Sequence, residues 1–404
     1  MSATNLKSPR YSRLCLLAGL LSWFSSSGQE LSYARKQLDT LSSNAFFGRG
    51  YSHGGQQLAA EYLLREFSRL GLEPLSDNYL HPFSLDINSI DSCYLAINKK
   101  VLEPGRDYLV HPNSGEGRGK LQKPAKALCI SSLRESPKIG NHTQLLLETG
   151  HEKLTWSVGR DSWPLPIFQL REGVLPTQIK SLDFVVQNTF KSHLLANVAG
   201  LIRGKTYPDA VIIISAHYDH LGMMGNTIFP GANDNASGTA MLLDMARHYT
   251  QVENQPHYSL LFIAFGAEEA GLVGSSYYVN NPLWPLEKTS FVLNLDLMAG
   301  GSEGIMVVNG EQELSAWMQL DSLNRAHELL TAVKKRGNAA NSDHYPFTQE
   351  AVPAIFVYTL GDVKAYHDPF DRAELLDLKH YDKTFRLLQL FIDQFQSQDT
   401  HGKR

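Results

Sequence analysis

Apolar runs and amphipathic segments alternate along the second half of the chain. Six apolar runs predict largely buried strands, because a short continuous apolar run is typical of a strand covered on both faces. They comprise residues 198–202, 211–214, 260–265, 291–297, 305–308 and 354–357. Between and after them, apolar residues recur at helical spacing in residues 239–249, 272–279, 314–330 and 378–394. The alternation predicts an α/β three-layer sandwich with a mixed, mostly parallel central sheet and helices on both faces.

The first half of the chain predicts two further helices and then changes character. Residues 30–43 and 56–70 carry apolar side chains at helical spacing, and Gly71 marks the end of the second helix. Beyond residue 82, short β-like runs alternate with Pro- and Gly-rich connections. These runs lie at residues 93–97, 127–130 and 154–158.

The change of character predicts a discontinuous main domain. We expect this domain to comprise residues 29–81 and 187–397, interrupted by a small β-rich insertion at 82–186 and followed by a tail at 398–404. The insertion has no His or Cys cluster at metal-ligand spacing, so we expect it to be catalytically silent. It either shapes access to a site or is an elaboration without a role.

The N-terminus has the order of regions typical of a secretory signal peptide. Lys7, Arg10 and Arg13 precede an apolar run at residues 14–24 and small residues at 25–28. This predicts a signal peptide at residues 1–28 and a secreted or periplasmic protein. The apolar run is short for a permanent membrane span. The alternatives are an uncleaved anchor and a buried N-terminal helix.

Composition argues against a nucleic-acid partner and leaves open whether two cysteines form a disulfide. The 404 residues carry a net charge of −4 and show no basic patch with interleaved aromatic residues, which argues against a nucleic-acid partner. Cys93 and Cys129 lie outside the signal peptide. In an oxidising compartment they form a disulfide or remain as two buried thiols.

Acidic and imidazole side chains follow the ends of several predicted strands. Active sites of open α/β proteins lie at this edge of the sheet, so we expect these side chains to meet there. In chain order they are His217 and Asp219, Asp234, Glu268 and Glu269, Asp296, and His367.

The residue types suit a pair of divalent metal ions. Imidazoles and carboxylates without a thiolate are ligands for zinc, cobalt or manganese. Two ions about 3.5–4 Å apart need one bridging carboxylate, plus one imidazole and one carboxylate each. Five ligands of these types are available. One member of the pair Glu268 and Glu269 would bind metal while its neighbour takes a proton from water.

Six motifs resemble, in order and spacing, those of the secreted di-zinc aminopeptidases. They read HYDHLG, GANDNASG, AFGAEEAGLVGSSYY, LNLDLMAG, SDHYPF and YHDPFD. That family also includes glutamate carboxypeptidase, the glutaminyl cyclases and the inactive ectodomain of the transferrin receptor. The resemblance is close over residues 192–396 and loose over residues 30–80.

The resemblance implies a role for each strand-end residue. Asp234 would bridge two zinc ions, with His217 and Asp296 at one ion and Glu269 and His367 at the other. Glu268 would be the general base that activates a water bound by both ions. Asp219 would fix the tautomer of His217, and Asp371 would lie near the metals. A cis peptide bond is expected after Asp234.

The implied activity is that of an aminopeptidase acting on peptides with a free N-terminus. A carboxypeptidase of the same fold would need an arginine cluster for the substrate carboxylate, and none is evident. The motifs also fit a glutaminyl cyclase. The remaining alternative is a catalytically dead binding paralogue, although such chains lose ligands and this one keeps all five together with the base. Several relatives stabilise the tetrahedral intermediate with a residue before the SDH motif, and no tyrosine stands there. The candidates for that role are Arg336, Asn341, Tyr345 and Tyr366.

Overall fold

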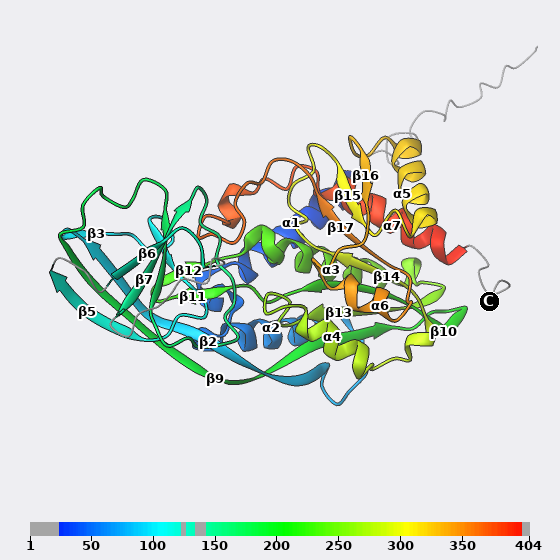
Figure 1. The fold of residues 1–404 in the computed structure, drawn as a ribbon. Coiled ribbons are helices and arrows are strands. Elements are labelled where there is room, and N and C mark those ends of the chain that lie inside the picture. Colours follow the sequence, from blue (N-terminus) through cyan, green and yellow to red (C-terminus); the bar gives the residue numbers. More distant parts are fainter. Residues whose placement is uncertain (1–23, 123–126, 134–142, 398–404) are drawn as a thin grey trace, which may run out of the picture.

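The computed structural model describes residues 24–122, 127–133 and 143–397 (Figure 1). Residues 1–23 of the predicted signal peptide and the predicted tail at 398–404 lie outside the described residues. The remaining residues of the predicted signal peptide open helix α1 (Phe24–Leu41). Within the described ranges, no helix combines the length and apolarity that crossing a membrane requires.

A large mixed sheet organises the main part of the molecule. In the described chain it has 13 strands, and its main path runs β12-β11-β2-β9-β13-β10-β14-β17-β15-β16. Strand β10 lies near the middle, parallel to β13 on one side and to β14 on the other, and β14 is parallel to β17. Strand β9 pairs antiparallel with β13, and β15 pairs antiparallel with β17. The predicted fold class is confirmed.

The strands on this path have the following bounds: β2 Leu80–Ile97, β9 Ser181–Ile202, β10 Tyr207–His217, β11 Gly222–Met224, β12 Thr227–Phe229, β13 Tyr258–Phe265, β14 Thr289–Leu295, β15 Ile305–Val308, β16 Val333–Arg336 and β17 Ala354–Thr359. The short strands β1 (Glu73–Pro74), β3 (Lys100–Val101) and β5 (Gly117–Gln122) pair with β9, β2 and β9. All six predicted strands of the second half lie within this set, to within two residues. Strand β16 was not predicted from the sequence.

Helices cover both faces of the sheet because alternate residues of each buried strand point to opposite sides. Ile212 and Ile214 of β10 pack against one group of helices, whereas Val211 and Ile213 face the other. The first group contains α1, α2 (Gly55–Leu70), α3 (Gly238–Tyr249), α5 (Leu314–His327) and α7 (Tyr381–Ser397). The second group contains α4 (Val273–Asn280) and α6 (His344–Gln349).

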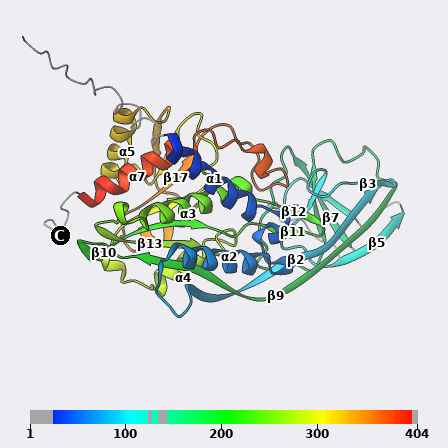
Figure 2. The same cartoon turned by 180° about the vertical axis from the view of Figure 1, so that it is seen from behind.

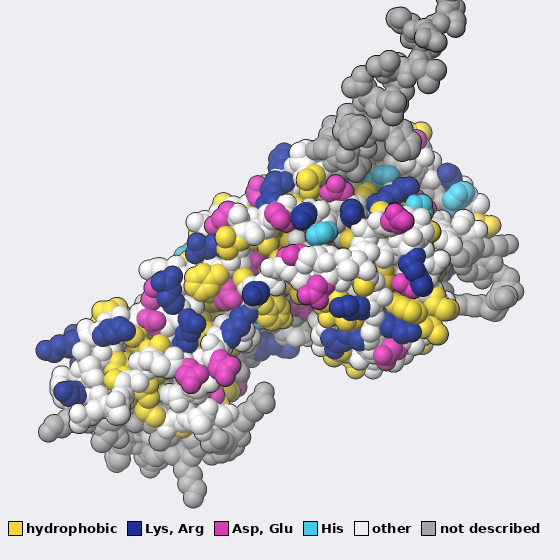
Figure 3. All heavy atoms as spheres, turned by 90° about the horizontal axis from the view of Figure 1, so that it is seen from above, with side chains coloured by type: hydrophobic (Ala, Val, Ile, Leu, Met, Phe, Trp, Pro, Cys, Tyr) yellow, Lys and Arg dark blue, Asp and Glu magenta, His cyan; other side chains and the backbone are white. Residues whose placement is uncertain are grey.

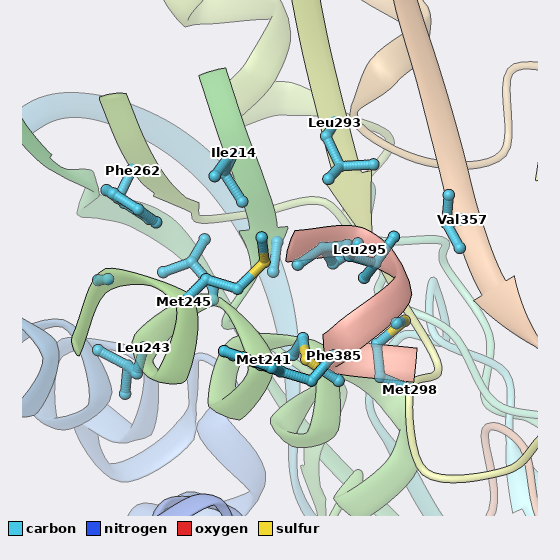
Figure 4. Packing of buried hydrophobic residues seen from close by; sticks show 14 of the residues in the cluster. Ile214, Met241, Leu243, Met245, Phe262, Leu293, Leu295, Met298, Val357 and Phe385 are labelled. Atoms are coloured by element: carbon cyan, nitrogen blue, oxygen red, sulfur yellow. The ribbon is translucent and has the colours of Figure 1, made fainter. Parts of the chain in front are cut away.

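The larger core lies between the central strands and two of these helices. Figure 4 shows Ile214 and Phe262 from the sheet above Met241 and Met245 of α3, with Phe385 of α7 beside them. All are buried. Helix α2 ends where the sequence predicts, because Gly71 adopts a left-handed φ of 78° and its N–H bonds back to the last turn.

Residues 82–186 form an extension with a core of its own. Strand β2 pairs with β9 along its length, and the two strands carry the main sheet into this region, so residues 82 and 186 both lie inside continuous strands. In the described chain, a second sheet of four strands packs there in the order β4-β8-β7-β6. Its strands are β4 (Tyr108–Val110), β6 (Ala127–Ile130), β7 (Leu145–His151) and β8 (Ile167–Arg171). Figure 2 shows this extension at the opposite end of the molecule from α5.

Two expectations about this region are resolved by the structure. The strand predicted at residues 154–158 is wrong, since this described segment is irregular and Trp156 bonds to His367 rather than to a strand. Cys93 and Cys129 are free thiols, and Cys129 is exposed.

Figure 3 shows basic and acidic side chains interspersed over one face of the described residues.

Candidate metal centre

The strand register brings the predicted site residues to one edge of the sheet. His217, the last residue of β10, is paired with Phe265, the last residue of β13. Glu268 and Glu269 lie in the turn shortly after β13, and Asp296 directly follows β14. Because β13 and β14 flank β10 and run parallel to it, the three chain ends open at the same place.

Asp234 reaches the same place from the turn that opens helix α3. This turn spans Ala232–Ser237 and contains the expected cis peptide bond, between Asp234 and Asn235. The carboxylate of Asp371 accepts hydrogen bonds from the backbone N–H of Asn233 at 2.8 Å and of Asp234 at 2.9 Å. The Asn235 amide donates to the Leu295 carbonyl at 3.0 Å, which ties the turn to the end of β14.

The five predicted ligands form two groups that share Asp234. Nε2 of His217 lies 3.5 Å from Oδ1 of Asp234 and 3.4 Å from Oδ2 of Asp296. Nε2 of His367 lies 3.1 Å from Oδ2 of Asp234 and 3.1 Å from Oε2 of Glu269. Asp234 therefore presents one oxygen to each group.

These separations suit divalent ions. Ligands at 2.0–2.1 Å in tetrahedral coordination lie roughly 3.3 Å apart. The side chains of Asp234, Glu269 and Asp296 are all less than a tenth exposed, and burying carboxylates together is unfavourable without compensating positive charge. Oδ1 of Asp296 has no hydrogen-bond partner among the described residues. The donor set thus fits metal ions, with oxygen and imidazole atoms turned toward a common centre.

A pocket of about 440 Å³ opens onto these groups. All five predicted ligands line it together with Glu268. Leu272, Phe356 and Tyr358 form apolar parts of the wall. Burial raises the pKa of Glu268 well above its usual range, although His217 opposes the shift. Burial would also raise the pKa of Glu269, but His367 and His220 outweigh it and hold that pKa well below its usual range.

Asp219 lies beneath the site and contacts the turn that carries the two glutamates. Its carboxylate accepts the N–H of Glu268 at 3.1 Å and that of Glu269 at 3.3 Å. Nδ1 of His217 lies 3.2 Å from the backbone oxygen of Asp219 and 3.8 Å from its Oδ1. A carbonyl oxygen only accepts, so this contact requires hydrogen on Nδ1 and leaves Nε2 of His217 free. Burial raises the pKa of Asp219 to about 7.

Two residues with no role assigned from the sequence also support the site. Nδ1 of His220 lies 2.7 Å from Oε1 of Glu269, so this glutamate contacts two imidazoles. His367 lines the pocket, whereas the His220 side chain is fully buried, and we therefore retain His367 as the predicted ligand. The position of His220 just after a predicted strand was the sequence feature that could have indicated its role near the site.

Arg49 is the second of these residues, and no sequence pattern indicates it. It is fully buried and donates to the carbonyls of Leu41, Tyr218, Pro230 and Gly231 at 2.6–2.9 Å. These carbonyls belong to the end of α1, the strand end with His217 and the turn before Asp234. One guanidinium thus joins three segments under the site.

Two of the four candidates for stabilising the tetrahedral intermediate line the pocket. Asn341 and Tyr366 belong to its wall, whereas Arg336 and Tyr345 are absent from the described residues that line it. The Tyr366 ring stacks on His367 with centroids 4.0 Å apart.

The fold and the site define an α/β protein with a buried carboxylate–imidazole cluster at the strand ends. Residues 197–392 match the model of peptidase family M28. The resemblance inferred from the six motifs is therefore confirmed.

Relatives and solved structures agree with this assignment. Aminopeptidase YwaD of Bacillus subtilis (strain 168) is 30% identical over 223 residues, which are 52% of this chain and 47% of YwaD. Leupeptin-inactivating enzyme 1 of Streptomyces exfoliatus is 32% identical over 156 residues, 38% of this chain and 34% of that enzyme. The chain therefore spans about half the length or less of these curated relatives.

Two solved structures share the fold over nearly the whole chain. BSAP, a zinc aminopeptidase from Bacillus subtilis, superimposes with a TM-score of 0.68 at 19% identity and covers 91% of this chain and 96% of its own. A peptidase M28 precursor from Shewanella amazonensis SB2B superimposes with a TM-score of 0.73 at 14% identity, over 95% and 97% of the two chains. At these identities the likeness shows the fold.

Proposed function

We propose that this protein is a metal-dependent aminopeptidase that binds two Zn²⁺ ions and removes N-terminal residues from peptides. The observation that carries the proposal is the arrangement around Asp234, whose two oxygens each face a separate imidazole–carboxylate pair. The name of the relative YwaD and the zinc in the name of BSAP support the activity and the metal.

The proposed ligands are His217, Asp234 and Asp296 for one ion, and Asp234, Glu269 and His367 for the other. Ions held there would polarise a peptide carbonyl and lower the pKa of water. Around them, the chain supplies orientation and a dry site. His220 holds the second oxygen of Glu269, and Ser342 donates to Oδ2 of Asp296 at 3.1 Å.

Glu268 is the proposed general base and acid. It borders the pocket without belonging to either ligand group around Asp234, so its carboxylate remains available for a proton. It would accept a proton from the attacking water and return it to the leaving amine. Asp219 would hold the glutamate turn and the ring of His217 in place. Asn341 or Tyr366 would donate a hydrogen bond to the oxyanion.

The charge of the pocket favours a free N-terminus over a free C-terminus. No Lys or Arg is among the described residues that line the pocket, so a substrate carboxylate would find no cationic side chain there. This supports an aminopeptidase over a carboxypeptidase of the same fold.

Two further proposals concern export and the domain organisation of the whole protein. We propose that residues 1–28 direct export and that residues 29–81 and 187–397 form the catalytic domain around the insertion at 82–186. Mass spectrometry of the N-terminus of exported protein tests the first. Processing at a site well away from residues 27 and 28, or no processing, contradicts it.

The test of the activity is a panel of aminoacyl-p-nitroanilides and N-blocked peptides, with elemental analysis of the same preparation. We expect cleavage of free-amine substrates only, loss of activity with a chelator, and two zinc ions per chain. Cleavage of N-blocked peptides but not of free amines would overturn the proposal. Cyclisation of N-terminal glutamine with one bound zinc ion would indicate a glutaminyl cyclase instead.

A further inference from the structure

We propose that the insertion at residues 82–186 takes part in the site, with Trp156 as the residue that positions His367. The inference rests on the proposed metal-binding role of His367. It gives a catalytic purpose to a part of the chain that carries no ligand of its own.

Two hydrogen bonds join Trp156 to His367. The Trp156 N–H donates to the His367 carbonyl at 2.9 Å, and Nδ1 of His367 lies 2.9 Å from the Trp156 carbonyl. A carbonyl oxygen only accepts, so the second contact requires the hydrogen of His367 on Nδ1. Nε2, which faces Asp234 and Glu269, is then left with its lone pair. Trp156 thus selects the tautomer that can bind metal.

His367 depends on such external support. It lies in the irregular segment between β17 and the short turn at Ala373–Leu375, so no helix or strand ladder holds its backbone. Its φ of 53° is in the left-handed region, which a residue with a Cβ adopts at a cost of roughly 1–2 kcal/mol. Contacts from other parts of the chain must therefore stabilise this conformation.

Trp156 is itself anchored on both sides. Its indole Nε1 donates to the carbonyl of Val110, in strand β4 of the insertion, at 2.8 Å. Its ring stacks on Phe229 of β12, with centroids 4.8 Å apart and an angle of 25° between the planes. The side chain is only 5% exposed. The position of the Trp156 backbone is thus set by packing between the insertion and the main sheet.

Two more residues of the insertion contact the same loop. Lys153 donates to the carbonyl of Lys364 at 3.1 Å and lies 3.7 Å from the carboxylate of Asp368. Gly105 lies so close to Pro369 that an added Cβ would stand 2.6 Å from its Cγ. The loop therefore meets the insertion on both sides of His367.

These contacts predict a specific loss of one metal ion. Removing the hydrogen-bond partner of a ligating histidine weakens metal binding by about 10–100-fold. Trp156→Ala keeps the carbonyl that accepts from Nδ1 and removes only the side chain that fixes its position, so we expect a loss at the lower end of this range. The loss should fall on the ion held by Glu269 and His367. The side chains of His217 and Asp296 contact Asp219, Asp234, Ser342 and each other, all outside the insertion, so an ion held by them should bind as before.

The experiment is a titration of metal-free protein with Co²⁺, followed by visible absorption and calorimetry. We expect wild type to bind two equivalents and Trp156→Ala to bind one of them about 10-fold more weakly. Trp156→Phe keeps the ring stack and the backbone contacts, so both affinities should stay within about 3-fold. Trp163→Ala is the matched control, because Trp163 stacks on His111 within the insertion, and it should match wild type.

A second variant guards against a folding defect in Trp156→Ala. Lys153 is half-exposed, so Lys153→Ala should fold and should weaken the same equivalent by about 3-fold. Lys120→Ala, which removes an exposed ion pair with Asp183, is its control. If Trp156→Ala folds and binds both equivalents as wild type does, the inference is overturned and the proposed function is unaffected. If Trp156→Ala does not fold, unchanged binding by Lys153→Ala has the same consequence. If wild type binds fewer than two equivalents, the proposed function fails, and the inference fails with it.

Discussion

Replacing Arg49 with methionine should destabilise the protein severely, although Arg49 is neither a predicted ligand nor a pocket residue. Methionine has an apolar side chain of similar length and no donor. The change therefore removes four hydrogen bonds of 2.6–2.9 Å and leaves the carbonyls of Leu41, Tyr218, Pro230 and Gly231 without that partner.

The magnitude follows from the cost of buried polar groups. Each carbonyl left unsatisfied costs roughly 1–3 kcal/mol, and neighbouring losses are not additive. We expect the free energy of unfolding to fall by about 5 kcal/mol, a large part of the 5–15 kcal/mol typical of folded proteins. The guanidinium also carries a positive charge that interacts with the buried acids. Burial lowers its pKa to about 10, so it remains charged at neutral pH and stabilises Asp371 and Asp234.

Arg49→Lys should lie between wild type and Arg49→Met. The ammonium keeps the charge but has three donors on a single nitrogen, which cannot reach carbonyls arranged around a planar guanidinium. We expect a loss of about 2–3 kcal/mol, which is roughly half the loss in the methionine variant.

Thermal and urea unfolding of metal-free protein would measure both variants, so that metal binding adds no stability. Arg203→Met is the matched control, because Arg203 is exposed and pairs with Glu73 at the surface, where an ion pair contributes about 0–1 kcal/mol. The reasoning is refuted if Arg49→Met unfolds within 1 kcal/mol of the control. That result would mean that water replaces the guanidinium at little cost.

Three further predictions concern the site. Glu268→Gln should keep both metals in elemental analysis and lower kcat by about 10²–10⁴-fold; normal turnover would remove Glu268 as the base. Asp234→Ala should lose metal from both positions, because each group uses one of its oxygens, and retention of two ions would contradict the bridging role. Tyr366→Phe should lower kcat by about 10²-fold with little change in KM if Tyr366 stabilises the oxyanion. Arg336→Met is its control, and an equal loss there would contradict the assignment.

The elements of the main domain were predictable because their signals are local. Continuous apolar runs mark the strands, and apolar residues at helical spacing mark the helices, so each boundary depends on a few neighbouring residues. The segment at 154–158 shows the limit of this reasoning. Its apolar residues suggest a strand, but the Trp156 backbone hydrogen-bonds to His367, 211 residues away.

The composition of the candidate site was also predictable, whereas its contacts were not. His217, Glu269 and Asp296 each end or follow a buried strand, and parallel strands bring such positions to one edge. The partners of the two imidazoles depend instead on how separate segments pack. The sequence suggests a carboxylate partner for Nδ1 of His217, and the structure puts the backbone oxygen of Asp219 closer.

The sequence by itself determined the α/β layering and the strand ends that carry acids and imidazoles, and its resemblance to a known family implied the cis bond after Asp234. These depend on period, residue type and motif, which remain visible in a linear chain. Only the tertiary structure decided that Arg49 joins three loops, that His220 contacts Glu269, and that the insertion reaches His367 through Trp156. The physical reason is that these are hydrogen bonds between irregular segments far apart in the chain. Such bonds have no periodic signature, and they form only when the sheet, the helices and the insertion have packed together.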